Sequence, residues 1–261
     1  FAEACLKRQS RDAIITQHWK DAPPGQASVP AQESLRFQSV FRFVERDGAE
    51  AVGAILDQDR TMVTEDARNL AEKALNAYAA AAILMPYAPF LEAAERHRYD
   101  LDILTRLFGV SYEQAAHRLV TLRRPGAEGP RFAFMRSDAS GFITKRLPLP
   151  RLPLPRYGHA CPLWVVYGAF QTPGITIRNF GELPSGEEFL FFARAVDKHP
   201  PRAGAPRQLL SIMLACSALD ASRVAAGDGI DPAQAMIPLG TTCRLCPRAA
   251  CDYRQEQSLA Q

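Results

Sequence analysis

The chain has 261 residues, of which 47% are hydrophobic and 23% are charged, and its formal net charge is +3. This length accommodates two domains with separate cores, and the composition is that of a soluble globular protein. The small net charge gives no indication of a nucleic-acid-binding surface. The longest apolar run, Ala77–Leu84, is far too short to span a bilayer, and no signal-peptide pattern is present. We therefore expect a cytoplasmic protein without a membrane partner.

Residues 1–124 carry helical patterns. Thr64 is a candidate N-cap for a long helix that ends before Pro86, and Ser111 with Gln114 forms a capping box. The last two helices of this half have helix-turn-helix spacing, but the core needs their apolar positions, which favours a packing role. Other helices are expected over residues 1–20, 33–45, 48–56, 89–98 and 101–108.

The proline- and glycine-rich stretch Arg124–Pro130 predicts a boundary between a helical domain, 1–124, and a second domain, 125–261. Beyond it the hydrophobic period becomes strand-like. We expect hairpins over 132–136 with 141–145 and over 175–182 with 187–196, a strand over 208–216, and helices over 161–170 and 218–226. This order predicts an α+β protein whose antiparallel sheet is comparable with PAS or GAF sensor domains.

Three of the six cysteines, Cys243, Cys246 and Cys251, form a C-x2-C-x4-C run. Three thiolates this close in sequence can share one metal centre, and a fourth ligand must come from Cys161 or Cys216. Cys161 is preferred because it lies in a loop-like stretch before Pro162. Cys216 ends an apolar strand, where a buried cysteine is a common packing residue.

The spacing favours a 4Fe–4S cluster, because three close cysteines and a remote one are typical of such clusters and a proline often follows a ligand. Pro247 and Pro162 fit this pattern. Zinc is the alternative, although structural zinc sites usually take two separated pairs of ligands. Disulfides are disfavoured because the chain has no secretory features. Four cysteine ligands leave no open position for chemistry, so we expect a structural or redox-sensing role.

A first resemblance concerns the helical half. The residues that carry it are Asn76–Pro86, Phe90, Leu104–Ser111 and Ala116–Leu119, which together resemble the ImmA/IrrE-type zincin domain. That family holds zinc with an H-E-x-x-H helix and a third, acidic ligand. The resemblance places Phe41, Arg42 and Glu45 at the His, Glu and His positions and Ala74 near the third. It therefore implies a degenerate peptidase scaffold without its zinc.

A second resemblance concerns the cysteine-bearing half. Gly158–Trp164, Ala169–Gly174 and Ile237–Cys251 resemble the C-terminal domain of short-chain fatty acyl transcriptional regulators of the RamB and PrpR type. The resemblance implies a non-enzymatic, homo-oligomeric transcription factor that responds to propionyl-CoA or acetyl-CoA. It also implies DNA binding through an N-terminal domain that this sequence lacks, and we expect an upstream segment because the chain begins within a helical pattern. The rival class is a metal-dependent enzyme, either a residual metallopeptidase or an iron–sulfur enzyme.

An acyl-CoA needs cations for its phosphates and an apolar surface for its acyl and adenine groups, and the planar guanidinium of arginine suits phosphate. Basic residues, Arg151 among them, gather before Cys161, and others occur on strands nearby. Each alone also fits a solvated surface charge. As a group, with the aromatic residues after Cys161, they give these candidate ligand-binding residues: Lys145, Arg146, Arg156, Trp164, Tyr167 and Arg178.

Overall fold

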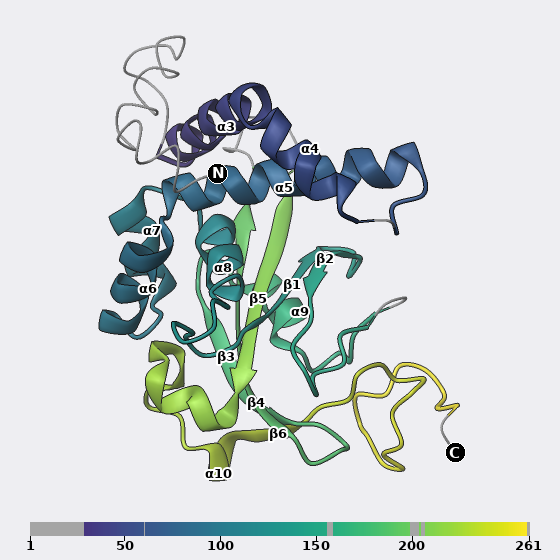
Figure 1. Cartoon of the computed structure of the whole chain (residues 1–261). Coiled ribbons are helices and arrows are strands. Elements are labelled where there is room, and N and C mark those ends of the chain that lie inside the picture. Colours follow the sequence, from purple (N-terminus) through teal and green to yellow (C-terminus); the bar gives the residue numbers. More distant parts are fainter. Residues whose placement is uncertain (1–28, 60, 156–158, 199–203, 205–206, 260–261) are drawn as a thin grey trace. The chain divides into compact units, whose positions relative to one another are not determined.

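The computed structural model describes residues 29–59, 61–155, 159–198, 204 and 207–259 (Figure 1). The helix expected over 1–20 and the candidate Arg156 lie outside these ranges. Contacts divide the chain into two compact units. The first contains the described residues up to Ala93 together with Ile103–Arg118, and the second contains Ala94–Asp102 together with the described residues from Leu119 onward. The predicted fold class, α+β, is confirmed.

The expected helix starts are present where the sequence places them. The Thr64 hydroxyl accepts a hydrogen bond from the Ala67 amide at 3.2 Å. Ser111 and Gln114 form the reciprocal capping box, with the Gln114 amide 3.3 Å from Ser111 Oγ and the Ser111 amide 2.9 Å from Gln114 Oε1. The helices before the sheet are α3 (Val29–Asp47), α4 (Ala49–Asp57), α5 (Glu65–Leu84), α6 (Tyr87–Arg96), α7 (Leu101–Phe108) and α8 (Tyr112–Val120).

Helix α5 is the longest described helix, and it is fixed at its C-terminal end by a buried cation. Arg118 Nε donates to the Met85 carbonyl at 3.0 Å, and the guanidinium lies 5.7 Å from the ring centroids of both Tyr78 and Tyr87. No single described helix is long and apolar enough to cross a membrane. Helices α5 and α6 meet that test only as a pair, bent by 65°.

One six-stranded sheet forms the centre of the second unit. Its order is β2-β1-β5-β4-β3-β6, and the first five strands pair antiparallel. The two predicted hairpins and the following strand are therefore confirmed. The parallel strand β6 was not predicted, because it is only three residues long and pairs with β3 alone. The strands are β1 (Ala133–Asp138), β2 (Ile143–Leu147), β3 (Ile177–Glu182), β4 (Glu188–Asp197), β5 (Leu209–Ser217) and β6 (Met236–Pro238).

Two helices expected in this half are shorter or of another kind. The stretch 161–170 contains only α9 (Val165–Gly168) before a 3-10 turn, η1 (Ala169–Gln171), because the Cys161 amide donates to the Thr241 carbonyl and 161–164 forms a turn. The stretch 218–226 forms two 3-10 helices, since Val224 is extended and the Ala225 amide donates to Arg98. These are η2 (Ala218–Arg223) and η3 (Ala225–Gly227), and α10 (Pro232–Ala235) precedes β6.

The sheet buries both faces, and alternation along β5 decides which residues meet. Met213 and Ala215 pack with Trp164 and the α9 segment in one apolar cluster. Because successive side chains of a strand point to opposite faces, Leu214 and Cys216 lie on the other side. The α9 face therefore carries Trp164, whose ring centroid lies 5.4 Å from that of Phe191.

The segment Ala94–Asp102 belongs to the sheet-containing unit through polar contacts. The Arg98 guanidinium forms two hydrogen bonds with Asp228, at 2.6 and 2.7 Å. The backbone carbonyl of Arg98 accepts a hydrogen bond from the Ala225 amide at 2.8 Å. Arg194 on β4 binds both carboxylate oxygens of Asp102 at 2.6 Å. The domain boundary expected at 124 and 125 stays a prediction.

Candidate functional site

The cysteine segment follows β6 and ends the described chain. Cys243 and Cys251 are partly exposed, whereas Cys246 is buried, as is Cys161 ahead of α9. The segment returns to the sheet at its start, where the Leu239 amide donates to the Glu182 carbonyl at 2.9 Å. This contact extends the short β6 pairing and brings the cysteine run toward the α9 segment.

Gly240 is the residue around which the cysteines gather. Its carbonyl accepts the Trp164 indole N–H at 2.7 Å, and its amide faces the sulfur of Cys161. A Cβ atom added to Gly240 would lie 3.0 Å from Cys246 Sγ. The thiols of Cys161 and Cys246 therefore lie against the same glycine, which explains why the smallest residue occupies this position.

The other two thiols are close enough for their charge to reach Cys161. Burial raises the pKa of the Cys161 thiol, and backbone hydrogen bonds from Gly240 and Leu163 oppose that rise. Thiolates at Cys243 and Cys251 raise the pKa further through like-charge repulsion. Backbone N–H groups that point at a sulfur stabilise its thiolate, the form that binds metal.

Cys216 lies apart from this group. It is fully buried in β5, opposite Leu190, on the sheet face away from Met213 and Ala215. Burial raises the pKa of its thiol far above the usual range, and Asp220 adds to the rise. A thiol that points into the opposite apolar layer is a packing residue.

The four cysteines of this region are of the residue type that a metal centre needs. Four thiolates are the ligands of a 4Fe–4S cluster and also of a structural zinc ion. Among the residues that the structure describes, no three His, Cys, Asp or Glu side chains converge closely enough to hold an ion. The sulfurs would therefore have to draw together around the bound group.

The cysteine segment is held to the sheet by a side chain within the run. Arg248 Nη2 donates to the Glu182 carbonyl of β3 at 3.0 Å. Within the segment, Ser258 Oγ donates to the Cys246 carbonyl at 2.9 Å and the Gln255 amide lies 3.5 Å from Cys243 Sγ. The conformation of the cysteine run is thus coupled to the edge of the sheet.

The predicted ligand-binding cations are not gathered at one place. Lys145 and Arg146 are on β2, whereas Arg178 is on β3, with β1, β5 and β4 between them. At the usual strand spacing this separation is about 19 Å. Arg146 donates to the carbonyls of Leu154 and Pro155 at 3.4 Å, and Arg178 donates to the Ala226 carbonyl at 2.9 Å. The hydrogen-bond acceptors of Arg146 are neutral, whereas Arg178 also lies within electrostatic range of Asp228.

The two predicted aromatic residues have structural contacts. Trp164 is 1% exposed, so its ring belongs to the core rather than to an open surface. The Tyr167 hydroxyl accepts a hydrogen bond from the Ala160 amide at 2.8 Å and is half-buried. Both side chains position the Cys161 entry, and contact of either with an acyl-CoA stays a prediction.

The positions aligned with the zincin ligands have no metal-site character. Phe41 stacks on Phe37 with ring centroids 6.2 Å apart. Arg42, Glu45 and Ala74 are exposed on their helices. An arginine and a phenylalanine in place of a glutamate and a histidine supply neither a base nor a ligand.

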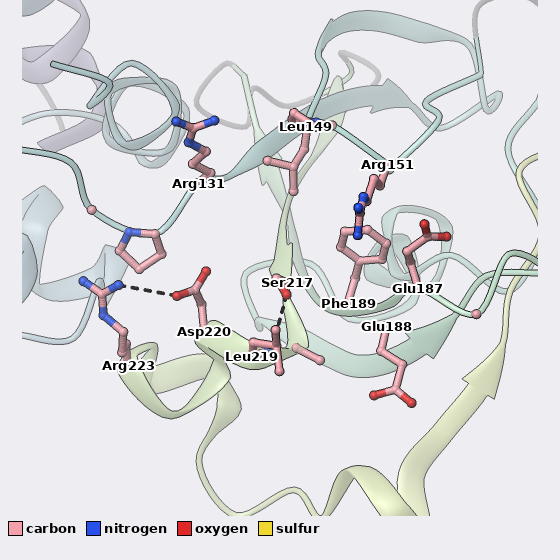
Figure 2. Close-up of a pocket in the computed structure, with 15 residues that line it drawn as sticks. Arg131, Leu149, Arg151, Glu187, Glu188, Phe189, Ser217, Leu219, Asp220 and Arg223 are labelled. Atoms are coloured by element: carbon pink, nitrogen blue, oxygen red, sulfur yellow. Dashed lines mark hydrogen bonds and ion pairs between the residues drawn. The ribbon is translucent and has the colours of Figure 1, made fainter. Parts of the chain in front are cut away.

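A cavity of about 600 Å³ in the sheet-containing unit was not foreseen from the sequence. Four separate segments line it: Gly129–Arg131, Leu149–Arg151, Gly186–Phe189 and Ser217–Arg223. Figure 2 shows Arg151 and Phe189 on one side of the cavity, and Asp220 paired with Arg223 on the other. Of its residues, the sequence had singled out only Arg151, as one of the basic cluster before Cys161.

Trp164→Phe tests the link between α9 and Gly240. The variant keeps an aromatic ring in the core but removes the indole donor, which leaves the buried Gly240 carbonyl without that hydrogen bond. We expect the free energy of unfolding to fall by about 1–3 kcal/mol. Urea denaturation followed by circular dichroism measures it, and a variant as stable as the parent would show that the indole does not position Gly240.

Comparison with known proteins places this arrangement among transcriptional regulators. Residues 121–261 match the family model "Short-chain fatty acyl coenzyme A regulator, C-terminal", and residues 51–120 match the "IrrE N-terminal-like domain". The first match covers more than half of the chain, so the chain belongs to the family of short-chain fatty acyl coenzyme A regulators. Both predicted resemblances are thereby confirmed.

Individual relatives support the same assignment. A propionyl-CoA carboxylase regulator of Cereibacter sphaeroides is 42% identical over 228 residues, which are 87% of this chain and 49% of the relative. The HTH-type transcriptional regulators RamB and PrpR of Mycobacterium tuberculosis are 35% and 33% identical, over 86% and 87% of this chain and 49% and 46% of their own length. The chain thus spans about half the length of these relatives.

A solved structure of a Mycobacterium tuberculosis transcriptional regulator has a TM-score of 0.88 and 27% identity, covering 100% of this chain and 88% of that one. The family and these relatives are transcriptional regulators rather than enzymes. This agrees with the prediction that the chain is not an enzyme.

Proposed function

We propose that the chain is the effector-binding portion of a bacterial transcription factor that senses a short-chain acyl-CoA, of the propionyl-CoA or acetyl-CoA class. The observation that carries this proposal is the family match over 121–261, which contains the whole sheet and all four neighbouring cysteines. The regulator names of the relatives, among them a propionyl-CoA carboxylase regulator, support it. DNA binding would belong to a further domain, and self-association is part of the same proposal.

The sheet supplies cations that an acyl-CoA can use. Arg146 makes hydrogen bonds only to carbonyl groups among the described residues, so it retains an uncompensated positive charge, whereas the charge of Arg178 is partly offset by Asp228. A guanidinium binds a phosphate with two parallel hydrogen bonds. Because the two residues lie four strands apart, they would contact different parts of one extended ligand or only one of them would take part. The likeness to PAS and GAF sensors remains an analogy of architecture.

Calorimetric titration of the cluster-loaded protein with acetyl-CoA, propionyl-CoA and free CoA tests the effector. We expect the acyl forms to bind and their affinity to fall as salt concentration rises, because phosphate contacts are screened. Arg146→Ala and Arg178→Ala then show which end of the sheet contacts phosphate. Absence of binding by all three compounds would remove acyl-CoA sensing from this chain.

We further propose that Cys161, Cys243, Cys246 and Cys251 hold a 4Fe–4S cluster with a structural or redox-sensing role. The convergence of Cys161 and Cys246 on Gly240, with Cys243 and Cys251 in electrostatic range, supports this ligand set over one that includes Cys216. Such a cluster supplies a one-electron redox centre when bound. Zinc is the alternative occupant, and metal analysis with acid-labile sulfide separates the two.

The chain's own residues would pass a change at the cluster to the sheet. Trp164 holds Gly240 from the α9 side, and Arg248 holds the cysteine run to Glu182 of β3. Loss of the cluster would free the segment between these two anchors, so the edge at β6 and the entry to α9 would loosen together. A redox signal would then modify the same unit that binds the effector.

A further inference from the structure

The cavity shown in Figure 2 lies where the backbone is strained. Three non-glycine residues of the described chain have positive φ: Arg98 at 50°, Tyr99 at 59° and Arg151 at 67°. Arg151 lines the cavity, and Tyr99, which follows Arg98, lies behind its Gly129 wall. Non-glycine residues persist in the left-handed region only where the surrounding structure imposes it, and they concentrate at ligand sites.

Arg151 offers an unused cation to this cavity. It lies at the tip of a tight turn that a bridge between Leu149 and Leu152 closes, with the Leu152 amide 3.1 Å from the Leu149 carbonyl. Its guanidinium lies on the same side of the cavity as Phe189 (Figure 2) and makes no hydrogen bond or ion pair with the residues that the structure describes. A strained turn thus holds an unpaired guanidinium at a cavity with an apolar part.

Tyr99 is buried behind the opposite wall, at Gly129, and is not itself among the residues that line the cavity. The residue is 3% exposed, and its hydroxyl lies close to the Arg223 guanidinium but has no hydrogen-bond partner of good geometry among the described residues. The hydroxyl lies 2.5 Å from the position that a Cβ of Gly129 would occupy, so only a glycine leaves this wall open. Burial raises the pKa of Tyr99 to about 12, with the Arg223 charge acting against the rise, and the hydroxyl remains a donor at neutral pH.

The remaining charges define what can bind. Arg223 is paired with Asp220 at 3.4 Å, and Glu187 accepts a hydrogen bond from Ser185. Arg131 also lines the cavity and is paired with Glu128 at 3.6 Å. Together with Glu188, the carboxylates of the cavity repel a highly charged polyphosphate more strongly than a ligand with a single negative charge, which can pair with Arg151. Leu149, Phe189 and the 92% exposed Leu219 provide apolar surface for its body.

We propose that this cavity binds a small organic carboxylate with a short aliphatic body, at a site separate from that of the acyl-CoA. The carboxylate is held by Arg151, and the aliphatic part lies on Phe189 and Leu149. This inference goes beyond the proposed function and does not depend on it. It gives the regulator a second input of different chemistry.

Calorimetric titration with sodium propionate, sodium butyrate and inorganic phosphate tests the site. Butyrate is expected to bind about fourfold more tightly than propionate, the effect of one buried methylene, and phosphate more weakly than either. Arg151→Gly should lower carboxylate affinity about tenfold or more. Because glycine accepts a positive φ without strain, the variant should melt at the same temperature as the parent or higher, which excludes misfolding as the cause. Butyrate should bind the parent equally well in the presence and absence of saturating acetyl-CoA.

Gly129→Ala is the second variant, because its added Cβ must displace the Tyr99 hydroxyl, and it should weaken carboxylate binding as well. Arg207→Ala, which removes an exposed arginine outside the cavity, is the matched control and should bind like the parent. The proposal is overturned if neither carboxylate binds, or if Arg151→Gly binds both unchanged. It is equally overturned if acetyl-CoA competes with butyrate on the parent protein, because the cavity would then belong to the effector site.

Discussion

Cys243→Ser, Cys246→Ser and Cys251→Ser are each expected to purify anaerobically without iron or acid-labile sulfide, whereas the parent protein carries both. Each replacement removes one of four thiolates, and a serine hydroxyl is not ionised at neutral pH. Iron and sulfide per chain are measured by colorimetric assay. Thermal unfolding should also move to lower temperature in each variant, because the segment between Gly240 and Arg248 then loses its tie through the cluster and keeps only hydrogen bonds to the rest of the unit.

Variants of Cys161 and Cys216 identify the fourth cluster ligand. Cys161→Ser should lose the cluster, because this thiol lies against Gly240 with Cys246. Cys216→Ala should keep the iron and lose about 1 kcal/mol of stability, because it removes a buried sulfur from the opposite sheet face. Cys5→Ser, in the part of the chain outside the described residues, serves as the silent control. A reversed pattern for Cys161 and Cys216 would show that the fourth ligand is wrong, and iron in all variants would exclude this cluster.

Local signals in the sequence predicted much of the secondary structure. Caps at Thr64 and Ser111 depend on contacts within three residues, so the sequence contains all that is needed to recognise them. The hairpins follow from alternation and turn residues in the same way. The prediction of one helix over 218–226 was wrong because the Ala225 amide donates a hydrogen bond to the Arg98 carbonyl. Arg98 lies 127 positions earlier, so no local pattern reveals this contact. The strand β6 escaped prediction for the same reason, since its three residues are ordered only by β3.

The candidate site was likewise predicted where local sequence patterns are sufficient and missed where contacts between distant residues are needed. Spacing identified Cys243, Cys246 and Cys251, and a loop-like context favoured Cys161. The sheet gives a physical reason to prefer Cys161 over Cys216, because alternation along β5 places Cys216 on the opposite face from Ala215. The basic cluster was less informative, since proximity in sequence put Arg146 on β2 and Arg178 on β3 into one group. The cavity was invisible because its four lining segments meet only after the sheet and the η2 turn have formed.

Arg118→Ala is expected to lower the stability of the helical unit by about 3 kcal/mol. The Arg118 side chain is 2% exposed, and its Nε donates a hydrogen bond to the backbone carbonyl of the buried Met85. The guanidinium also lies over the rings of Tyr78 and Tyr87. Truncation removes that hydrogen bond and both cation–π contacts, and it opens a cavity beside the C-terminal end of α5. Urea denaturation followed by circular dichroism measures the change. A buried arginine, and not a metal ion, would then hold the C-terminal end of α5 in place in the zincin-like helical unit.

Arg106→Ala is the matched control for this loss, because Arg106 is an exposed arginine of α7 in the same unit. Removing its charge should change the free energy of unfolding by less than about 0.5 kcal/mol, as is usual for exposed positions. Arg118→Lys should fall between the two, since lysine keeps the charge but not the planar donor that reaches the Met85 carbonyl while lying over both rings. Equal stabilities for Arg118→Ala and Arg106→Ala would show that the guanidinium does not fix α5, and that apolar packing of Ala80, Ile83 and Leu84 alone holds this helix.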